Sequence, residues 1–380
     1  MTAFRYLTAG ESHGPCLTAI VEGLPAGLRL DLTAINRDMA RRQQGYGRGG
    51  RMKIESDRVE ILSGVRFGET IGGPVTLQVR NRDWENWTGR MAAFGSPEGE
   101  RVTAARPGHA DYVGILKYDR QDIRDILERS SARETAMRVA AGGLAKEFLR
   151  ALGIGVSSSV INIGGEKANP SADGDAADSE LNCRDKDAEA RMKERIRQAK
   201  EAGDTLGGVF EVIVRGAPVG LGSHIQWDRR LDSRLAGALM SIQAIKGVEI
   251  GAGFQYADLP GSQAHDELFY DTDGRVVRRT NRAGGIEGGM SNGEEIVLRA
   301  VMKPIPTLMK PLHSIDIERH EAVLASKERS DVCAVSAASV VGEAMTALVM
   351  AQAVLEKFPG DSMRELLAAL DAYRKQLAER

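Results

Sequence analysis

The feature that most constrains the fold is an apolar stretch of 24 residues late in the chain, at 332–355. Its sequence, VCAVSAASVVGEAMTALVMAQAVL, contains one charged residue, Glu343. This length is enough to cross a bilayer. However, the stretch is rich in Ala and Ser, Glu343 lies in its middle, and the chain has no second stretch of this kind. A helix that is apolar on nearly all sides is typical of the core of a large protein or of a subunit contact, so we predict a buried helix rather than a membrane span.

Flanking residues predict where this helix begins and ends. Ser330 or Asp331 can cap its N-terminus, and Pro359-Gly360 would end it. Arg329 completes a charged group at the entry to the apolar helix. Asp331 is therefore either a simple cap or a carboxylate with a tuned pKa.

The overall composition excludes several classes of protein. The 380 residues include 51 Lys and Arg against 53 Asp and Glu, a net charge of −2, which argues against a general nucleic-acid or membrane binder. Cys16, Cys183 and Cys333 lie far apart without a CxxC motif, so we expect no disulfide framework and no metal site. The N-terminus lacks the basic start and apolar core of a secretory signal. We expect a cytoplasmic protein.

The order of apolar patterns predicts an α+β chain rather than a strict alternation of strands and helices. Length alone suggests two or three domains, or one large interwoven domain. Strands are indicated by β-branched or alternating runs, and helices by apolar residues at helical spacing. We expect strands at 17–22, 58–65, 74–80, 154–163 and 208–215, helices at 33–43 (capped by Thr33), 228–246 and 361–379, two helical pieces within 120–152, and a hairpin at 269–278 with Asp273-Gly274 at its turn.

The most polar part of the chain is 165–206. It begins with a segment containing ADGDAADSE, which indicates an exposed loop. The charged run RDKDAEARMKERIRQAKEAGD follows, and its i,i+4 charge pairs indicate a solvated helix. We predict that insertions and mobility concentrate in this segment.

Two histidines lie in glycine-containing loops, in the sequences Gly10-Glu11-Ser12-His13-Gly14 and Arg106-Pro107-Gly108-His109-Ala110-Asp111. The signatures of P-loop, Rossmann, zinc-protease and GxSxG enzymes are absent. A loop histidine is a candidate acid or base. Each histidine can also be structural, His13 in a tight turn and His109 satisfied by Asp111, and the residues alone leave both interpretations open.

Basic residues are concentrated in two places. The segment 37–53 contains Arg37, Arg41, Arg42, Arg48, Arg51 and Lys53 against one acidic residue, Asp38. Arginine forks and flexible glycine backbone suit phosphate and carboxylate groups, although a solvated face or a nucleic-acid contact has the same composition. Arg129-Ser130-Ser131-Ala132-Arg133 precedes a predicted helix. This arrangement suits an anion at the helix N-terminus, or simple capping by Ser131.

Taken together, eight blocks resemble the chorismate synthase family, in the family's order and along almost the whole chain. Eight blocks in order are specific where one would be weak. The poorest match is 165–206, where the family varies. The blocks are GESHGPCLTAIVEGLP (10–25), RRQQGYGRGGRMKIESDRVE (41–60), RPGHADY (106–112), ERSSARET (128–135), QAIKGVEIG (243–251), GGIEGGMSNG (284–293), KPIPT (303–307) and RSDVCAV (329–335).

The resemblance implies a reaction, a fold and an assembly. The family is a lyase of the shikimate pathway that converts 5-enolpyruvylshikimate-3-phosphate to chorismate and phosphate by a 1,4-anti elimination. It requires reduced FMN although the reaction is redox-neutral overall. The implied fold is a single α+β domain, 1–380, with helices outside a core of antiparallel sheets, assembled as a homotetramer. No separate reductase segment is evident, so we expect an external flavin reductase, with NADPH as the other possible reductant.

The resemblance also implies roles for individual residues. His13 matches the histidine that protonates the leaving phosphate, His109 the histidine that serves the flavin, and Asp331 a carboxylate near flavin N5. Ser12 and Ser130 match hydroxyls that support this relay. The implied FMN contacts are Arg129, Ser130, Ser131, Gln243, Ala244, Gly288, Lys303, Pro304, Ile305, Pro306, Thr307 and Arg329. Arg42 and Arg48 match positions that contact NADP, and the anionic substrate is expected at Arg42, Arg48, Arg51, Arg106, Arg133 and Arg329.

Two other functions remain at this point. A nucleic-acid-binding protein could use the GYGRGGR loop, but it would need a wider basic surface and more aromatic residues than the 5% present. A flavoprotein of the same fold could act on a different elimination substrate.

Overall fold

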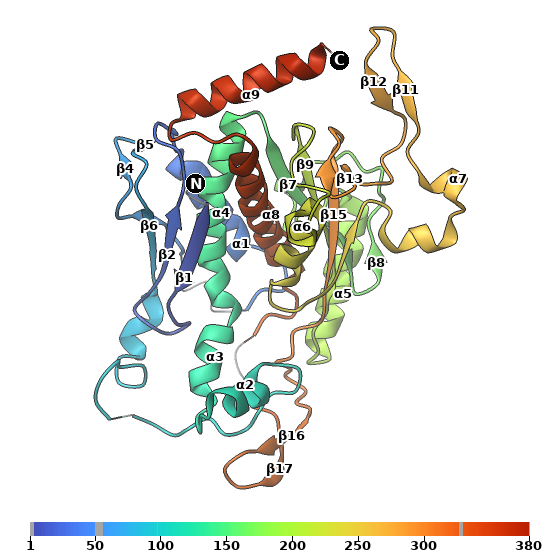
Figure 1. Cartoon of the computed structure of the whole chain (residues 1–380). Coiled ribbons are helices and arrows are strands. Elements are labelled where there is room, and N and C mark those ends of the chain that lie inside the picture. The colour runs from blue at the N-terminus through green and yellow to red at the C-terminus, as the bar shows by residue number, and fades with distance from the viewer. Residues whose placement is uncertain (1–3, 50–55, 97, 327–329, 380) are drawn as a thin grey trace.

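A computed structural model describes residues 4–49, 56–96, 98–326 and 330–379. Figure 1 shows two antiparallel sheets with long helices between them. The first sheet has the strand order β1-β2-β6-β3, and the second has the order β10-β15-β9-β7-β8. The strands are β1 (Arg5–Ala9), β2 (Cys16–Glu22), β6 (Val75–Arg80), β3 (Glu60–Ile61), β10 (Ile245–Ile250), β15 (Ile296–Met302), β9 (Gly208–Arg215), β7 (Gly155–Ile163) and β8 (Glu166–Lys167).

The remaining elements surround these sheets. The helices are α1 (Leu32–Gln43), α2 (Asp111–Tyr118), α3 (Arg124–Ser130), α4 (Thr135–Ala151), α5 (Lys186–Glu201), α6 (Leu231–Met240), α7 (Gly261–Ala264), α8 (Val335–Lys357) and α9 (Met363–Ala378). Short 3₁₀ helices include η2 (Arg82–Asn86), η3 (Ala132–Glu134), η4 (Ala176–Asp178), η5 (Trp227–Arg229) and η6 (Gly253–Asp258). Two-residue to four-residue strands form the hairpins β4–β5 (Val65–Arg66, Glu69–Thr70), β11–β12 (Leu268–Tyr270, Val276–Arg278), β13–β14 (Ile286–Glu287, Met290–Ser291) and β16–β17 (His313–Asp316, Glu321–Leu324).

Each sheet buries one face because apolar residues alternate along its strands. In the first sheet, Leu17, Ala19 and Val21 of β2 are buried, with Val79 and Leu77 opposite the first two. In the second sheet, alternate residues of β9 and β15 are buried in the same way, namely Phe210, Val212, Val214, Ile296, Leu298 and Ala300. The two buried faces and the helices between them form one hydrophobic core.

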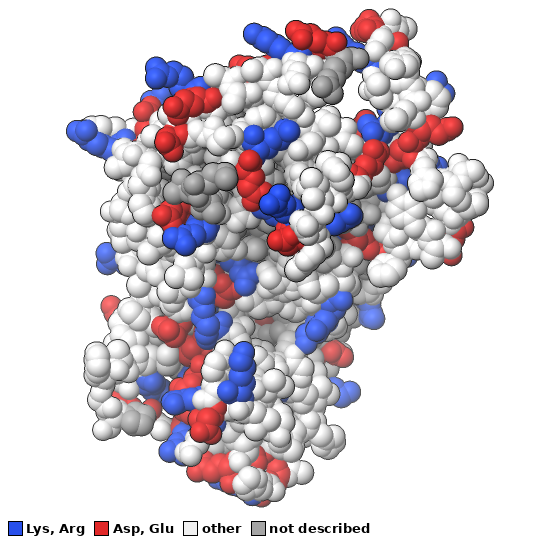
Figure 2. Space-filling view, in the orientation of Figure 1, with Lys and Arg blue, Asp and Glu red and all other residues white. Residues whose placement is uncertain are grey.

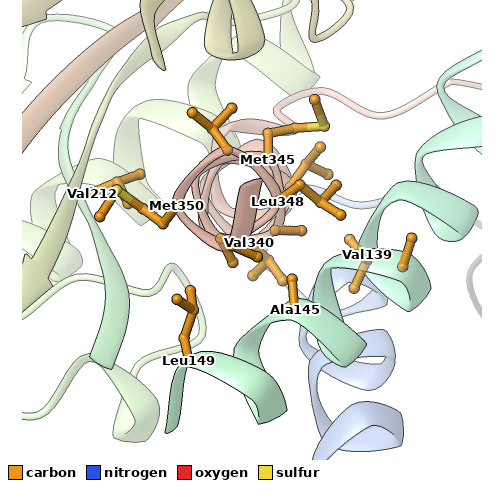
Figure 3. Packing of buried hydrophobic residues seen from close by; sticks show 14 of the residues in the cluster. Val139, Ala145, Leu149, Val212, Val340, Met345, Leu348 and Met350 are labelled. Carbon is orange, nitrogen blue, oxygen red and sulfur yellow. The ribbon is translucent and has the colours of Figure 1, made fainter. Parts of the chain in front are cut away.

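The helix α8 confirms the buried helix predicted at 332–355. Figure 3 looks along it and shows Val340, Met345, Leu348 and Met350 pointing outward around its circumference. Residues of α4 lie on one side of α8, and Val212 of β9 lies on another. By length and composition α8 is the one helix in the described ranges that could span a membrane, but 89% of its most apolar window is buried inside the protein.

The α+β class with antiparallel sheets is confirmed, but the layer order differs from the one that the resemblance implied. We expected helices outside a core of sheets, whereas α4 and α8 lie between the two sheets (Figure 1). The reason is that α8 is apolar on nearly all sides and therefore needs other elements packed around nearly all of its circumference. Gly142 and Gly143 of α4 allow the close approach: a Cβ at Gly142 would lie 2.5 Å from Ala344 Cα, and one at Gly143 would lie 2.9 Å from Ile35 Cγ2.

Two predicted helix caps are wrong. The helix α1 is capped by Asp31, whose side chain accepts hydrogen bonds from the backbone N–H groups of Thr33 and Ala34, so Thr33 is not the cap. The helix α8 begins after Ala334 without a side-chain cap. Asp331 instead accepts a hydrogen bond from Gly49, because the chain of the 44–49 loop returns to this point.

Other predicted elements are confirmed with shifted bounds. The strands at 17–22, 74–80, 154–163 and 208–215, the helices at 33–43 and 361–379, and the hairpin at 269–278 are all present. The strand expected at 58–65 is reduced to Glu60–Ile61, and the helix expected at 228–246 ends at Met240, where the chain turns into β10.

The segment 165–206 contains the predicted charged helix as α5. It is not solvated on all sides, because Ala188, Met192 and Ile196 lie in the main core. Its outer face carries the expected i,i+4 pairs, including Arg197 with Glu201. The predicted insertions and mobility of this segment stay a prediction.

Candidate active site

The candidate site lies where the N-terminal ends of α4 and α8 meet the C-terminal end of α1. Arg42 of α1 donates to Oγ1 of Thr135, the first residue of α4, at 3.1 Å. The backbone N–H of Val332, just before α8, donates to the carbonyl of Gly47 at 2.8 Å. Helix N-termini carry partial positive charge, so two long helices direct favourable potential for an anion to this place.

The first histidine loop connects β1 and β2 and is held by α3. The carboxylate of Glu128 accepts the His13 backbone N–H at 2.7 Å and lies 2.8 Å from His13 Nδ1. Ser12 donates its backbone N–H to the carbonyl of the same Glu128, and its hydroxyl lies 3.2 Å from that of Ser131. Burial acts to raise the pKa of Glu128, but the hydrogen bonds and charge of His13 outweigh it and leave the pKa below the ordinary value. Glu128 is therefore an ionised acceptor at neutral pH.

The second histidine loop precedes α2. Nδ1 of His109 makes a short contact with Asp111, which is fully buried. Arg106 donates to the same carboxylate from its backbone N–H, from Nε at 2.8 Å and from Nη2 at 3.0 Å. Arg106 also donates to Thr307 Oγ1 at 3.2 Å. Burial acts to raise the pKa of Asp111, but these hydrogen bonds lower it far below its usual range.

A chain of contacts joins the start of α4 to the second histidine loop. Gln243 donates to Glu134, in η3 at the start of α4, at 2.6 Å. The carbonyl of Ala244 accepts the backbone N–H of Lys303 at 2.9 Å. The Lys303 ammonium then donates to the carbonyl of Gly108, beside His109, at 2.5 Å. The structure thus places the predicted FMN contacts Gln243, Ala244 and Lys303 between the start of α4 and the second histidine loop. Pro304, Ile305, Pro306 and Thr307 follow Lys303 along the chain.

Two predicted anion-binding arginines are buried around a carboxylate that we did not predict. Arg133 donates to both oxygens of Asp57, at 2.7 and 2.6 Å, and to Asn81 Oδ1. Nη1 of Arg42 lies 3.6 Å from Asp57 Oδ2. Burial lowers the pKa of Arg42 to about 10, which leaves it charged at neutral pH. Two guanidinium groups therefore share one carboxylate, which leaves this buried group of three side chains with a net positive charge.

The other predicted residues of the site are less buried or lie apart. Arg48 pairs with Asp331 at 3.3 Å, and Arg129 donates to the carbonyls of Thr8 and Gly10, which anchors the His13 loop. Ser130 lies at the end of α3, where its hydroxyl is 3.4 Å from the Leu127 carbonyl. Across the face shown in Figure 2, positive and negative side chains are interleaved rather than separated.

One predicted contact is not brought to this place. Gly288 lies in the β13–β14 turn, and its neighbour Gly289 accepts the backbone N–H of Leu231 at the start of α6. Gln243 follows the C-terminal end of α6, and the helix between the two ends is about 15 Å long. Gly288 and Gln243 therefore lie near opposite ends of α6. Arg51 and Arg329 lie outside the described residues.

Three residues of the site escaped the sequence reasoning. Glu128 stands within the block ERSSARET, but nothing in its spacing points to a histidine that lies 115 residues away. Trp87, whose ring centroid is 3.9 Å from that of His13, lies in a polar segment without a motif. Asp57 stands within the block 41–60, but nothing in its spacing points to Arg133, which lies 76 residues away.

The buried polar atoms test whether a flavin fits here. Oε1 of Gln243 and Nη1 of Arg42 are buried and lack a hydrogen-bond partner among the described residues. A flavin carries N–H, carbonyl and hydroxyl groups and a phosphate, which are suitable partners for an amide oxygen and a guanidinium. The residues present therefore fit such a group.

Comparisons with known proteins all identify the same family. The family model described as "Chorismate synthase" matches residues 4–355. The chain is 60% identical to a "Chorismate synthase" of Geobacter metallireducens over 97% of this chain and 98% of that protein. It is 58% identical to another of Syntrophotalea carbinolica, covering 98% of both chains. A solved structure, "Crystal Structure of Chorismate Synthase", is similar over 100% of this chain and 99% of that chain, with a TM-score of 0.80 and 43% identity.

Proposed function

The chain belongs to the chorismate synthase family, and from this membership we propose how its residues carry out the family's reaction. The activity is that of a carbon–oxygen lyase in the shikimate pathway. The substrate, 5-enolpyruvylshikimate-3-phosphate, loses its phosphate and a ring hydrogen at C6, and chorismate and phosphate are formed. The phosphate and two carboxylates of this substrate require a site with surplus positive charge.

We propose that the residues between the two histidine loops hold reduced FMN. The contacts are Gln243, Ala244 and Lys303, with Arg129 and Ser131 from the end of α3 and the following turn. The buried, unpartnered Oε1 of Gln243 supports this assignment. When bound, reduced FMN lends electron density as phosphate leaves and regains it as the hydrogen departs, so the reaction is redox-neutral overall.

His13 is the proposed proton donor to the leaving phosphate. Glu128 holds its Nδ1, so Nε2 is the nitrogen that can serve the substrate. Ser12 and Ser131 lie next to it and support the loop. The surplus charge of Arg42 and Arg133 around Asp57 stabilises the phosphate from below, although both guanidinium groups are themselves buried.

His109 and Asp331 are the proposed acid–base partners on the flavin side. His109 is held by Asp111 and Arg106, in the loop that Lys303 contacts. The carboxylate of Asp331, held by the Gly49 N–H at 2.6 Å and beside Arg48, is the proposed proton acceptor near flavin N5. Ser130 completes this set from the end of α3.

The oligomeric state, the cellular location and the source of reduced flavin are proposals as well. We propose a cytoplasmic homotetramer whose flavin is reduced by an external reductase, with NADPH as the other candidate reductant at Arg42 and Arg48. The variable segment is 165–206, and the chain otherwise acts as one domain.

One observation carries the proposed function: contacts through Gln243, Ala244 and Lys303 connect the start of α4, next to the turn that touches the His13 loop, with Gly108 beside His109. The test is an anaerobic assay with chemically reduced FMN and 5-enolpyruvylshikimate-3-phosphate, with and without NADPH. We expect turnover with catalytic amounts of reduced FMN, and none with oxidised FMN alone. Turnover with oxidised FMN and no reductant would contradict the flavin assignment.

A further inference from the structure

Glu128 makes a two-point contact with a single residue. One of its oxygens accepts the His13 backbone N–H at 2.7 Å, and the other lies 2.8 Å from Nδ1 of the same histidine. Only 2% of the Glu128 side chain is exposed. A buried carboxylate that binds both the backbone and the ring of one residue fixes the position of the loop and the orientation of the ring together.

This contact also fixes where the imidazole carries its proton. The lowered pKa of Glu128 means that the carboxylate is ionised at neutral pH, and an ionised carboxylate only accepts hydrogen bonds. Nδ1 of His13 must therefore be the protonated nitrogen. Nε2 has no hydrogen-bond partner among the described residues, which leaves it available to a ligand. A proton on Nε2 then exists in the imidazolium form, which is the form that a general acid needs.

The plane of the ring is fixed from one side by Trp87. The two ring centroids are 3.9 Å apart, with a tilt of 31°. Nε1 of Trp87 donates to Asp83 at 3.0 Å. The guanidinium groups of Arg124 and Arg90 lie 5.1 and 5.5 Å from the Trp87 ring. The indole is therefore itself held in place and covers one face of His13.

We propose that Glu128 is the positioning residue of His13: it keeps the Nδ1 proton and directs Nε2 to the leaving phosphate, while Trp87 holds the ring plane. This deepens the proposed function and rests on it for the identity of the phosphate. The other charged groups around His13 are Glu11 in its own loop, Arg129 and Arg124 on α3, and Asp83 and Arg90 beside Trp87. Among the described residues, Glu128 is the charged group that makes a hydrogen bond to the imidazole itself.

Trp87 provides a direct readout, because a protonated imidazole in contact with an indole quenches its fluorescence. Tryptophan emission of the full chain is measured against pH, without substrate or flavin. We expect a rise in emission as His13 loses its proton, and this step disappears in Trp87→Phe and in His13→Gln. In Glu128→Gln the negative charge beside the ring is lost, which disfavours the charged imidazole, so the midpoint of the step moves to lower pH.

The matched control is Glu147→Gln. Glu147 is a similarly buried helix carboxylate that accepts a backbone N–H, from Asp31 at 3.1 Å, but it faces no histidine. Its replacement should leave the midpoint unchanged. A step that survives His13→Gln, or a midpoint that stays the same in Glu128→Gln, overturns the proposal. If Glu128→Gln does not fold, Glu128→Asp replaces it. The shorter Asp side chain holds its carboxylate farther from the imidazole, so the midpoint of the emission step must then move to lower pH. An unchanged midpoint overturns the proposal.

Steady-state kinetics with chemically reduced FMN provide the second readout. We expect Glu128→Gln to lower kcat about 10- to 100-fold, less than the roughly 10²–10⁴ that a general acid contributes in full, with KM changed less than about threefold. A loss confined to KM overturns the positioning role. The emission measurement needs no turnover, so a shifted midpoint in an enzyme without activity would support the positioning role and count against the proposed function.

Discussion

The two histidine loops resemble each other in chemistry and differ in how their carboxylates are shared. His13 and His109 each present Nδ1 to a buried carboxylate. Asp111 also accepts three hydrogen bonds from Arg106, so its negative charge is largely neutralised by a guanidinium. Glu128 has one longer contact to Arg124, at 3.3 Å, and two shorter ones to His13. The comparison shows that two similar pairs can act differently: Glu128 is available to support a positive charge on His13, whereas Asp111 mainly holds Arg106 and the orientation of His109.

Replacing each histidine by alanine is the strongest way to test this difference. We expect His13→Ala to lower kcat about 10²–10⁴-fold, because the leaving phosphate loses its proton donor. His109→Ala should instead change the spectrum of reduced flavin in the ternary complex with a substrate analogue. Both variants should fold, because Glu128 and Asp111 keep other hydrogen-bond partners.

The measurements are anaerobic kinetics and absorbance spectra. If His13→Ala changed the flavin spectrum and His109→Ala did not, the two roles would be reversed. Full activity in both variants would mean that neither histidine takes part in the reaction.

Asp111→Asn should have the largest effect on stability in this pair of loops. The substitution leaves the buried guanidinium of Arg106 without its carboxylate, and breaking a buried ion pair costs about 3–5 kcal/mol. Urea denaturation of the wild type and the variant gives the difference in the free energy of unfolding. A difference below about 1 kcal/mol would show that Arg106 does not depend on Asp111.

The pH dependence of stability should follow from the lowered pKa of Asp111. A carboxyl group whose pKa is lower in the folded state contributes stability above its unfolded value, near 4, and loses it as pH falls towards the folded value. The difference in unfolding free energy between wild type and Asp111→Asn should therefore shrink between pH 5 and pH 3. Glu128→Gln should behave in the same direction, because the pKa of Glu128 is also lowered. A difference that stays constant over this range would contradict the ionised state of these groups.

Trp87→Phe should have the smallest effect on stability and activity, and it should change only the His13 loop. The contact between the two rings is lost in part, and such aromatic contacts contribute about 0.5–1.5 kcal/mol. We expect a small decrease in Tm and a modest decrease in kcat. A loss of activity as large as that of His13→Ala would show that Trp87 contacts the substrate.

The sequence by itself determined several of the main strands and helices and one of the local contacts of the site. Alternating apolar residues identified β2, β6, β7 and β9, because the pattern of a half-buried strand is set by its own side chains. The apolar run at 332–355 identified α8 for a similar reason. The pairing of His109 with Asp111 was among the alternatives from the start, since only Ala110 separates them and one turn brings them together.

Only the tertiary structure decided which distant side chains share a charge. Glu128 meets His13 across 115 residues. Asp57 lies between Arg42 and Arg133 because the end of α1 meets the start of α4. The layer order likewise depended on packing: the apolar circumference of α8 predicts burial but does not specify which elements cover it. Helices and turns depend mainly on residues that are close along the chain, so the local sequence predicts them. The ion-pair partner of a buried carboxylate is brought to it by the folding of the whole chain, so the local sequence does not predict that partner.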